Sequence, residues 1–149
     1  MKETKGKVHT KRVRVNVRRQ GNNFERDVVR FFANLLQITP YNGKNVNDAQ
    51  VGRSSHFSKA LDDMGIDIWF KDSYLAGLFK VQCKKSKKKD IDISSIEDYP
   101  DRLLFTKLTS QKEGNSRESH RATMVTMDIA LFEDIMNVYL TKTSNNDKP

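Results

Sequence analysis

Two short stretches of alternating polarity, residues 65–70 and 78–84, constrain the fold of this chain most strongly. Side chains of a strand alternate between two faces, so this pattern predicts two strands with one apolar face each. The apolar positions are Ile66, Ile68 and Phe70 in the first stretch and Phe79, Val81 and Cys83 in the second. The intervening residues 71–73 are turn-like, so we expect the two strands to pair as a hairpin.

The polar faces of these two strands carry the candidate chemistry. Asp67 lies on the polar face of the first strand, and Gln82 and Lys84 share the polar face of the second. We expect these three side chains to converge on one patch. A carboxylate and an amide oxygen can bind a hard divalent cation, and a lysine beside them can stabilise an anion. Cys83 falls on the apolar face, which indicates a buried structural thiol rather than a nucleophile.

This arrangement resembles the PD-(D/E)XK nuclease superfamily, and within it the archaeal-type Holliday junction resolvases and their phage-borne relatives. Asp67 matches the aspartate of the motif, and Gln82-Cys83-Lys84 matches the (D/E)-x-K tripeptide, with glutamine where glutamate is usual. The resemblance implies an α/β fold, a single-domain restriction-endonuclease-like core. In such a core a mixed central β-sheet is flanked by helices in the order α-β-β-β-α-β-β-α.

A second motif lies ahead of the strands, at residues 21–26. These residues read Gly-Asn-Asn-Phe-Glu-Arg and fit the Gly-x-x-x-Glu-Arg pattern with which these resolvases begin. An asparagine here can cap a helix that starts at this point. Glu25, taken alone, is an acid in a first helical turn, a common placement. The resemblance implies instead that Glu25 supports the metal site and that Arg26 contacts DNA or a nearby acid.

The helix predicted after residue 23 has one apolar stripe. Its members are Phe24, Val28, Phe31, Phe32, Leu35 and Leu36. We expect one domain over residues 21–140, preceded by a basic arm at 1–20 and followed by a polar tail at 141–149. Valine alternates with arginine within the arm, so part of it could be an edge strand; otherwise it is a flexible tail.

Positive charge favours a polyanionic partner. The formal net charge is +8 and the pI is near 9.6, which points to nucleic acid first and an anionic membrane surface second. The basic arm and the run of residues 84–89, directly after the motif strand, are both suited to phosphate contact. Lys85, Lys87 and Lys88 are the candidate contacts in this run. The alternative is a solvated terminus and a solvated charged face.

Other candidate DNA contacts come from the resemblance. Resolvases of this family carry an arginine followed by serines ahead of the aspartate strand, and Arg53 and Ser55 fit this pattern loosely, with a role in phosphate binding. A lysine of the penultimate strand approaches the site in the family, and Lys107 is the candidate here. His56 could act as a general base, although a lone loop histidine is more often incidental. We assign residues 62–63 to a loop or a helix end.

The second half of the chain is expected to complete the core. The predicted elements are a short helix capped by Ser94 or Ser95, strands at 102–108 and 122–127, a polar loop at 111–121 and a helix capped by Asp128. The apolar residues of that last helix are Phe132, Ile135, Met136, Tyr139 and Leu140.

Several classes of protein are disfavoured by what the chain contains. One cysteine excludes an internal disulfide and a cysteine-based zinc cluster. No apolar run approaches the roughly 20 residues of a membrane span, and no hydrophobic signal segment opens the chain. We therefore expect no membrane partner and a cytoplasmic location, which is the host cytoplasm if a virus encodes the protein.

The resemblance implies a structure-selective endonuclease that resolves four-way (Holliday) junctions by metal-dependent phosphodiester hydrolysis. Asp67, Gln82 and the carbonyl of Cys83 would bind Mg²⁺ or Mn²⁺, with Glu25 acting directly or through water. Lys84 would orient the attacking water or stabilise the transition state. The implied partners are branched DNA and a second copy in a homodimer, without a small-molecule cofactor. The alternatives are another endonuclease of the superfamily acting on linear or damaged DNA, and a non-catalytic DNA-binding module of this fold.

Overall fold

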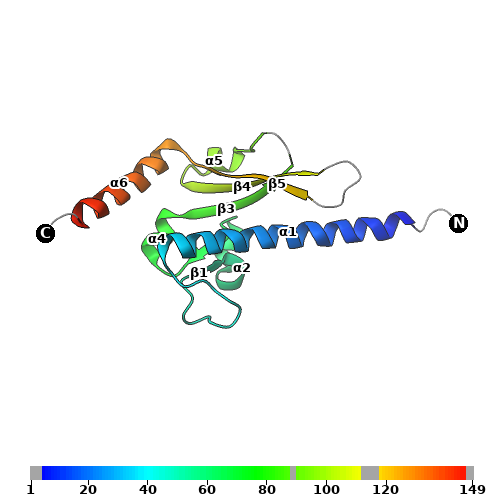
Figure 1. The fold of residues 1–149 in the computed structure, drawn as a ribbon, viewed down its shortest axis with the longest axis horizontal. Helices are drawn as coiled ribbons and strands as arrows, with labels where there is room; N and C mark the ends of the chain where they lie inside the picture. Colours follow the sequence, from blue (N-terminus) through cyan, green and yellow to red (C-terminus); the bar gives the residue numbers. More distant parts are fainter. Residues whose placement is uncertain (1–4, 88–89, 112–117, 147–149) are drawn as a thin grey trace.

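Helices and strands alternate along the chain (Figure 1). The computed structural model describes the backbone of residues 5–87, 90–111 and 118–146, and the side chains of residues 21–87, 90–110 and 119–142. The elements are α1 (Lys5–Leu36), β1 (Val51–Arg53), α2 (Ser54–Phe57), α3 (Lys59–Asp63), β2 (Ile68–Phe70), α4 (Ser73–Leu78), β3 (Lys80–Ser86), α5 (Ser94–Asp98), β4 (Arg102–Gln111), β5 (Glu118–Thr126) and α6 (Ile129–Asn146).

Helix α1 begins at Lys5, so the prediction that a helix starts after Asn23 is wrong. Residues 5–20 are helical, so the edge strand considered for this arm does not form. Lysine, arginine and glutamine are good helix formers, and one glycine inside a helix costs only about 1 kcal/mol relative to alanine. Gly21 is therefore tolerated in the middle of α1, where an added Cβ would meet nothing within 4 Å.

The strands form two small sheets instead of one central sheet. β1 pairs antiparallel with β2, and β3 pairs parallel with β4, which pairs antiparallel with β5. The protein is therefore a mixed α/β structure with a small mixed sheet and helices. The expected order α-β-β-β-α-β-β-α is not the observed one, because the additional helices α2, α3 and α4, of four to six residues, interrupt the first three strands, and α5 is equally short with five residues.

The predicted hairpin between residues 65–70 and 78–84 is wrong. Helix α4 occupies the place of the expected turn, and Asp72 caps it by accepting a hydrogen bond from Leu75 N (2.9 Å). β2 pairs with β1 and not with β3. The two stretches still meet at one point, where the N–H of Asp67 donates to Val81 O (2.8 Å).

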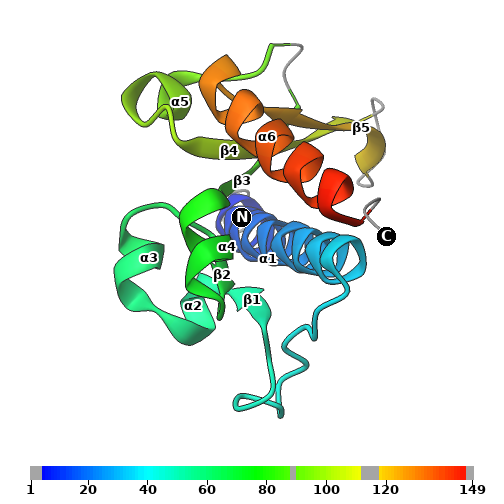
Figure 2. The ribbon, with the colours of Figure 1, turned by 90° about the vertical axis from the view of Figure 1, so that its left-hand side faces the viewer.

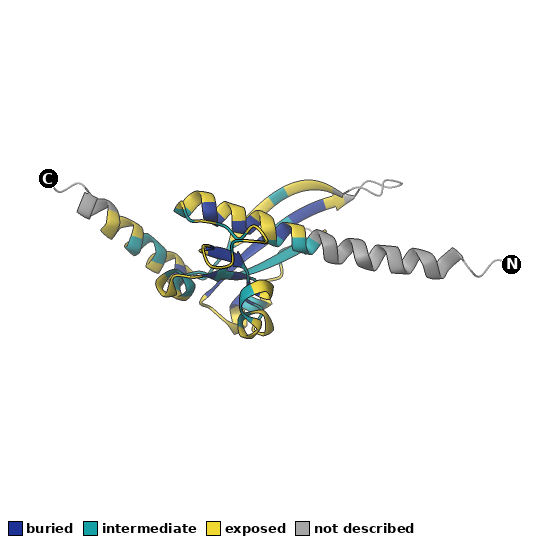
Figure 3. Cartoon of the chain, turned by 90° about the horizontal axis from the view of Figure 1, so that it is seen from below, coloured by how far each residue is buried: buried dark blue, intermediate teal, exposed yellow. Residues whose placement is uncertain are grey.

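The core lies where α1 packs against strands of both sheets (Figures 2 and 3). Alternation is confirmed in the first predicted strand, because Ile66, Ile68 and Phe70 are all buried. Phe32, 1% exposed, is central: its ring centroid lies 5.2 Å from that of Phe70, 5.3 Å from that of Phe79 and 5.5 Å from that of Phe105. The predicted stripe of α1 is correct at Phe24, Val28 and Phe32, whereas Phe31 and Leu35 are exposed.

The second half of the chain is mostly as expected. α5 begins at Ser94, so the prediction that Ser94 or Ser95 caps it is wrong: the capping position is Ile93, which has no side-chain cap bond. β4 begins at Arg102, and Asp128 Oδ1 accepts a hydrogen bond from Ala130 N (2.9 Å) at the start of α6, as expected. The loop expected at 111–121 is shorter, because residues 118–121 belong to β5; residues 112–117 lie outside the described residues. Residues 141–146, expected in a polar tail, continue α6.

Helix α6 differs from its expected packing. Leu131 is the buried residue of this helix, while Phe132, Tyr139 and Leu140 of the predicted apolar stripe are exposed. Figure 3 shows α6 coloured mostly as exposed or intermediate. No helix in the described part of the chain is long and apolar enough to cross a membrane.

Replacement of Phe32 by alanine tests the position of the core. We expect Phe32→Ala to lower the free energy of unfolding by about 3–5 kcal/mol, the usual loss for a buried phenylalanine. Leu35→Ala, on the same helix but 61% exposed, is the matched control and should change stability by less than about 0.5 kcal/mol. Urea denaturation measures both values. Equal losses in the two variants would show that α1 does not pack through Phe32.

Candidate active site

Asp67 lies at the seam between the two sheets, directly before β2. Its N–H donates to Val81 O (2.8 Å), and its carbonyl accepts from Ser54 N (2.9 Å). Its Oδ2 accepts from the N–H of Cys83 (2.7 Å). These three bonds hold the carboxylate against the centre of β3, the strand that carries the Gln-x-Lys tripeptide.

The surroundings of Asp67 disfavour its charged form. Its pKa is raised from 3.8 to about 6, mainly because the carboxyl group is desolvated by burial. Glu25 and Asp62 raise the pKa further through charge repulsion, whereas the Cys83 N–H bond and Arg102 lower it. A carboxylate in such surroundings gains more than a solvated one from a nearby cation.

Cys83 offers backbone atoms to the site and turns its side chain to the core. Within a strand, the N–H and the C=O of one residue point to the same edge, so the carbonyl of Cys83 is directed toward Asp67 as its N–H is. The thiol is partly buried and packs against the core, as predicted. Burial, followed by the charges of Asp67 and Glu25, raises the thiol pKa well above its ordinary value, so the thiol is a poor nucleophile.

Gln82 has an unsatisfied oxygen. Its Oε1 is buried and has no hydrogen-bond partner among the described residues. An unpaired buried polar group costs about 1–3 kcal/mol, so a ligand for this oxygen would be stabilising. Lys84 lies two residues further along β3, so it shares a face with Gln82, and it stands opposite Thr106 of β4.

Glu25 reaches the site from α1 as half of an ion pair. Arg53 Nε donates to Glu25 Oε2 at 2.6 Å, and Arg53 Nη2 donates to Asn22 Oδ1 at 2.9 Å. The pair is largely shielded, with 11% of the Arg53 side chain and 22% of the Glu25 side chain exposed. Glu25 raises the pKa of both Asp67 and Cys83, so its charge acts on the candidate site that these two residues form. Arg53, expected to bind phosphate, therefore also orients the candidate metal ligand.

Three partners of the site were not found from the sequence. Asn22 was interpreted as a helix cap and instead holds Arg53. Ser54, and not the exposed Ser55, contacts the site: it is fully buried and its Oγ donates to Ile66 O. Arg102, 4% exposed, donates to Met64 O and acts on the charge of Asp67. No short motif marks any of these residues, although the family pattern did point to the serine beside Arg53.

The remaining predicted contacts are dispersed. Arg26, Ser55 and Lys87 are exposed and Lys85 is half-buried, whereas Lys88 lies outside the described residues. Lys107 follows Thr106 in β4, so it lies on the opposite face of the sheet from Lys84, in a pocket with Asp27 and His120. The structure therefore does not place Lys107 beside Gln82 and Lys84. Residues 62–63 end helix α3, as expected.

The site fits a sparse metal centre in donor type but not in the number of acidic ligands. Among the described residues, no group of three or more His, Cys, Asp or Glu side chains could hold a metal ion. A cation here would depend on Asp67, the Cys83 carbonyl and the orphaned Gln82 oxygen, with Glu25 nearby. These are the oxygen donors that Mg²⁺ prefers, and Mg²⁺ retains several waters in protein sites.

The comparisons with known proteins give no relative. No protein-family model, no curated protein and no solved structure matches this chain. The resemblance to the PD-(D/E)XK nucleases therefore depends on the motif residues of the sequence alone.

The raised pKa of Asp67 predicts a pH-dependent stability. Between pH 4 and pH 6 the native state holds a proton on Asp67 that the unfolded state, with a pKa near 3.8, has lost. The free energy of unfolding should therefore fall as pH rises through this range and then level off. Asp67→Asn should remove this contribution, and urea denaturation at intervals of pH measures it.

Asp63→Asn is the control for that measurement, because Asp63 is a nearby exposed acid at the end of α3 whose charge is not among those that shift the pKa of Asp67. It should leave the fall in stability between pH 4 and pH 6 in place. If the stability of the Asp67→Asn variant followed pH in parallel with that of the wild type, burial of an ionisable Asp67 would be contradicted.

Proposed function

We propose that this protein is a metal-dependent DNA endonuclease that resolves four-way junctions. The observation that carries the proposal is the hydrogen bond from Cys83 N to Asp67 Oδ2 (2.7 Å), which holds a carboxylate against the strand of Gln82 and Lys84. The junction substrate, and the homodimer that would bring two sites to opposite strands, are proposed from the resemblance alone.

Four groups would hold the cation: the Asp67 carboxylate, Gln82 Oε1, the Cys83 carbonyl and, directly or through water, Glu25. When bound, Mg²⁺ or Mn²⁺ would lower the pKa of a coordinated water and neutralise charge on the scissile phosphate. Asp67 must be ionised to bind a cation, so its pKa near 6 leaves it competent at neutral pH. The ion pair with Arg53 fixes the orientation of the Glu25 side chain near Asp67.

The chain also supplies positive charge for the substrate. Lys84 shares the strand face of Gln82 and would stabilise the additional charge that develops on the phosphate in the transition state. The net charge of +8 attracts the DNA backbone, with an attraction that falls as salt rises. Binding should therefore be much more sensitive to salt than to sequence.

One specific observation favours a second candidate, a DNA-binding module of the same architecture that does not cut. Glutamine at position 82 contributes no negative charge, and no group of three acidic or other metal-binding side chains occurs in the part of the chain that the structure describes. A hydrolase acting on linear or damaged DNA remains the third candidate, because the same site would serve it. Substrate choice depends on loops and on any dimer interface.

Cleavage of a synthetic four-way junction tests the proposal. We expect the wild type with Mg²⁺ or Mn²⁺ to place paired nicks near the branch point and to spare a linear duplex built from the same arms. Asp67→Asn should reduce the rate by about 100-fold or more, the scale for loss of one electrostatic group in an active site. Denaturing gels of end-labelled strands measure the products.

Two further variants make the test discriminating. Asp63→Asn should cut at the wild-type rate, because Asp63 is exposed, lies outside the proposed ligand set and does not act on the pKa of Asp67. Gln82→Glu adds a carboxylate and should lower the metal concentration needed for cleavage. Equal cleavage of junction and duplex would reject the junction substrate and keep the nuclease. Junction binding without cleavage, in both the wild type and Gln82→Glu, would support the non-catalytic module.

A further inference from the structure

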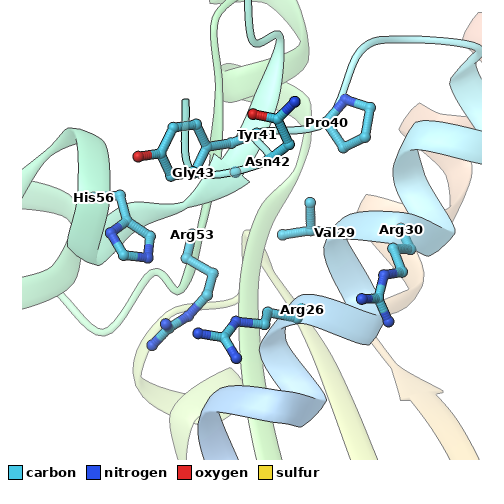
Figure 4. A pocket seen from close by; sticks show the side chains of 10 residues that line it. Arg26, Val29, Arg30, Pro40, Tyr41, Asn42, Gly43, Arg53 and His56 are labelled. Carbon is cyan, nitrogen blue, oxygen red and sulfur yellow. The ribbon is translucent and has the colours of Figure 1, made fainter. Parts of the chain in front are cut away.

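A basic pocket opens beside the candidate active site. It has a volume of about 580 Å³ and lies between α1, the loop at residues 40–43, β1 and α2 (Figure 4). Its charged lining consists of Arg26, Arg30 and Arg53, together with the ring of His56. None of its ten lining residues is acidic. The pocket is therefore a concave surface with excess positive charge, which is suited to an anion.

Arg26 and Arg53 form the centre of this charge. Both arginines line the pocket, and in Figure 4 Arg53 appears between His56 and Arg26. Arg53 has one carboxylate partner, Glu25, whereas Arg26 makes a long hydrogen bond to the neutral Asn23 side chain (3.5 Å). Positive charges that line one pocket repel each other, and an anion bound in the pocket would offset that repulsion.

The pKa of His56 is affected by the same positive charges. Burial lowers its pKa from the usual 6.5, and the charges of Arg53 and Arg26 lower it further, against the opposing effect of Glu25. An anion in the pocket would oppose the effect of Arg53 and Arg26 and so raise the pKa of His56. His56 would then become an additional donor to that anion.

The opposite wall of the pocket is suited to a nucleotide. Tyr41 and Pro40 line it, and the Tyr41 ring packs 5.3 Å from that of His56 and 5.0 Å from that of Phe57. The loop is braced by its own side chains: Asn45 Oδ1 accepts from Asn42 N (2.8 Å), and Asn42 Oδ1 accepts from Lys44 N (2.9 Å). A rigid aromatic wall beside arginines can stack a base while the arginines bind its phosphate.

We propose that this pocket binds the terminal phosphate monoester of a DNA strand. A monoester carries a charge of about −1.5 to −2 at neutral pH and presents three oxygens, which suits two guanidinium groups and an imidazole. A phosphodiester within a duplex carries one charge and continues into sugars on both sides, so it fits a ridge or groove better than a concave pocket. Because Arg53 also binds Glu25, the strand end would lie beside the candidate active site.

Binding of a strand end does not require hydrolysis and can be tested without cleavage. Fluorescence anisotropy with a short labelled DNA strand, in the absence of divalent metal, compares a 5′-phosphate end, a 3′-phosphate end and two hydroxyl ends. We expect one of the phosphorylated strands to bind about tenfold more tightly than the hydroxyl strand, and this arm identifies which end is recognised. Equal affinity for all three strands would overturn the proposal, whatever the outcome of the cleavage assay.

Two substitutions test whether the preference for a phosphorylated strand end arises in this pocket. Arg26→Gln should reduce the preference for the phosphorylated end at least fivefold, since Arg26 is exposed and its replacement leaves the Arg53–Glu25 pair intact. Arg121→Gln removes an exposed arginine on β5 that does not line the pocket, and it should weaken binding of all strands equally. If Arg26→Gln also weakened all strands equally, the pocket would not be the site of recognition.

A competition arm identifies the source of the phosphate. Deoxynucleoside monophosphate should displace the phosphorylated strand only at concentrations well above the dissociation constant of that strand, because the strand adds backbone contacts. Displacement at equal concentration would reject the strand end and assign the pocket to a free nucleotide.

Discussion

Two hydrogen bonds from Asp67 to β3 connect the two sheets of this protein. The N–H of Asp67 donates to Val81 O, and its carboxylate accepts from Cys83 N. No strand ladder joins the β1–β2 pair to β3 in the described structure, so α1, these bonds, the bond from Arg102 to Met64 O and the packing of Phe70 on Phe79 hold the two parts in place. The residue that ties the fold together is therefore also the residue on which the proposed chemistry depends, and its burial is the source of its raised pKa.

Short sequence patterns correctly predicted features that depend only on neighbouring residues, such as the buried face of a strand. Alternation placed Ile66, Ile68 and Phe70 on one buried face because a period of two follows from strand geometry alone. The hairpin prediction failed at Asp72, which caps a helix instead of turning the chain; that helix is too short to show a helical period. The helix start predicted at residues 21–23 failed because capping residues favour an end without requiring one, and the preceding residues continue the helix.

Only some residues of the candidate site could be predicted from the sequence, and the reason is physical. Asp67 and Gln82 could be named from a motif, because they are near in sequence and Asp67 is hydrogen-bonded to the residues of β3 on either side of Gln82. Arg102 is brought to Asp67 by a crossover through α5, and its burial depends on contacts with Met64 and Tyr99. The pairing of Arg53 with Glu25 spans 28 positions, and no spacing rule encodes it. Such long-range partners are set by packing, which the sequence pattern does not express.

The narrow connection between the sheets has a consequence for motion. Parts of a native protein open with different free energies, and a region held by few hydrogen bonds opens before the whole molecule unfolds. The seam at Asp67 has few hydrogen bonds but adjoins the buried residues Ile66, Ile68 and Val81, so the amide hydrogens of Asp67 and Cys83 should exchange with solvent only when the two sheets separate. A ligand that contacts both sides of the seam would slow exchange at these two amides first. Hydrogen exchange at these two amides would therefore show whether the candidate site is occupied.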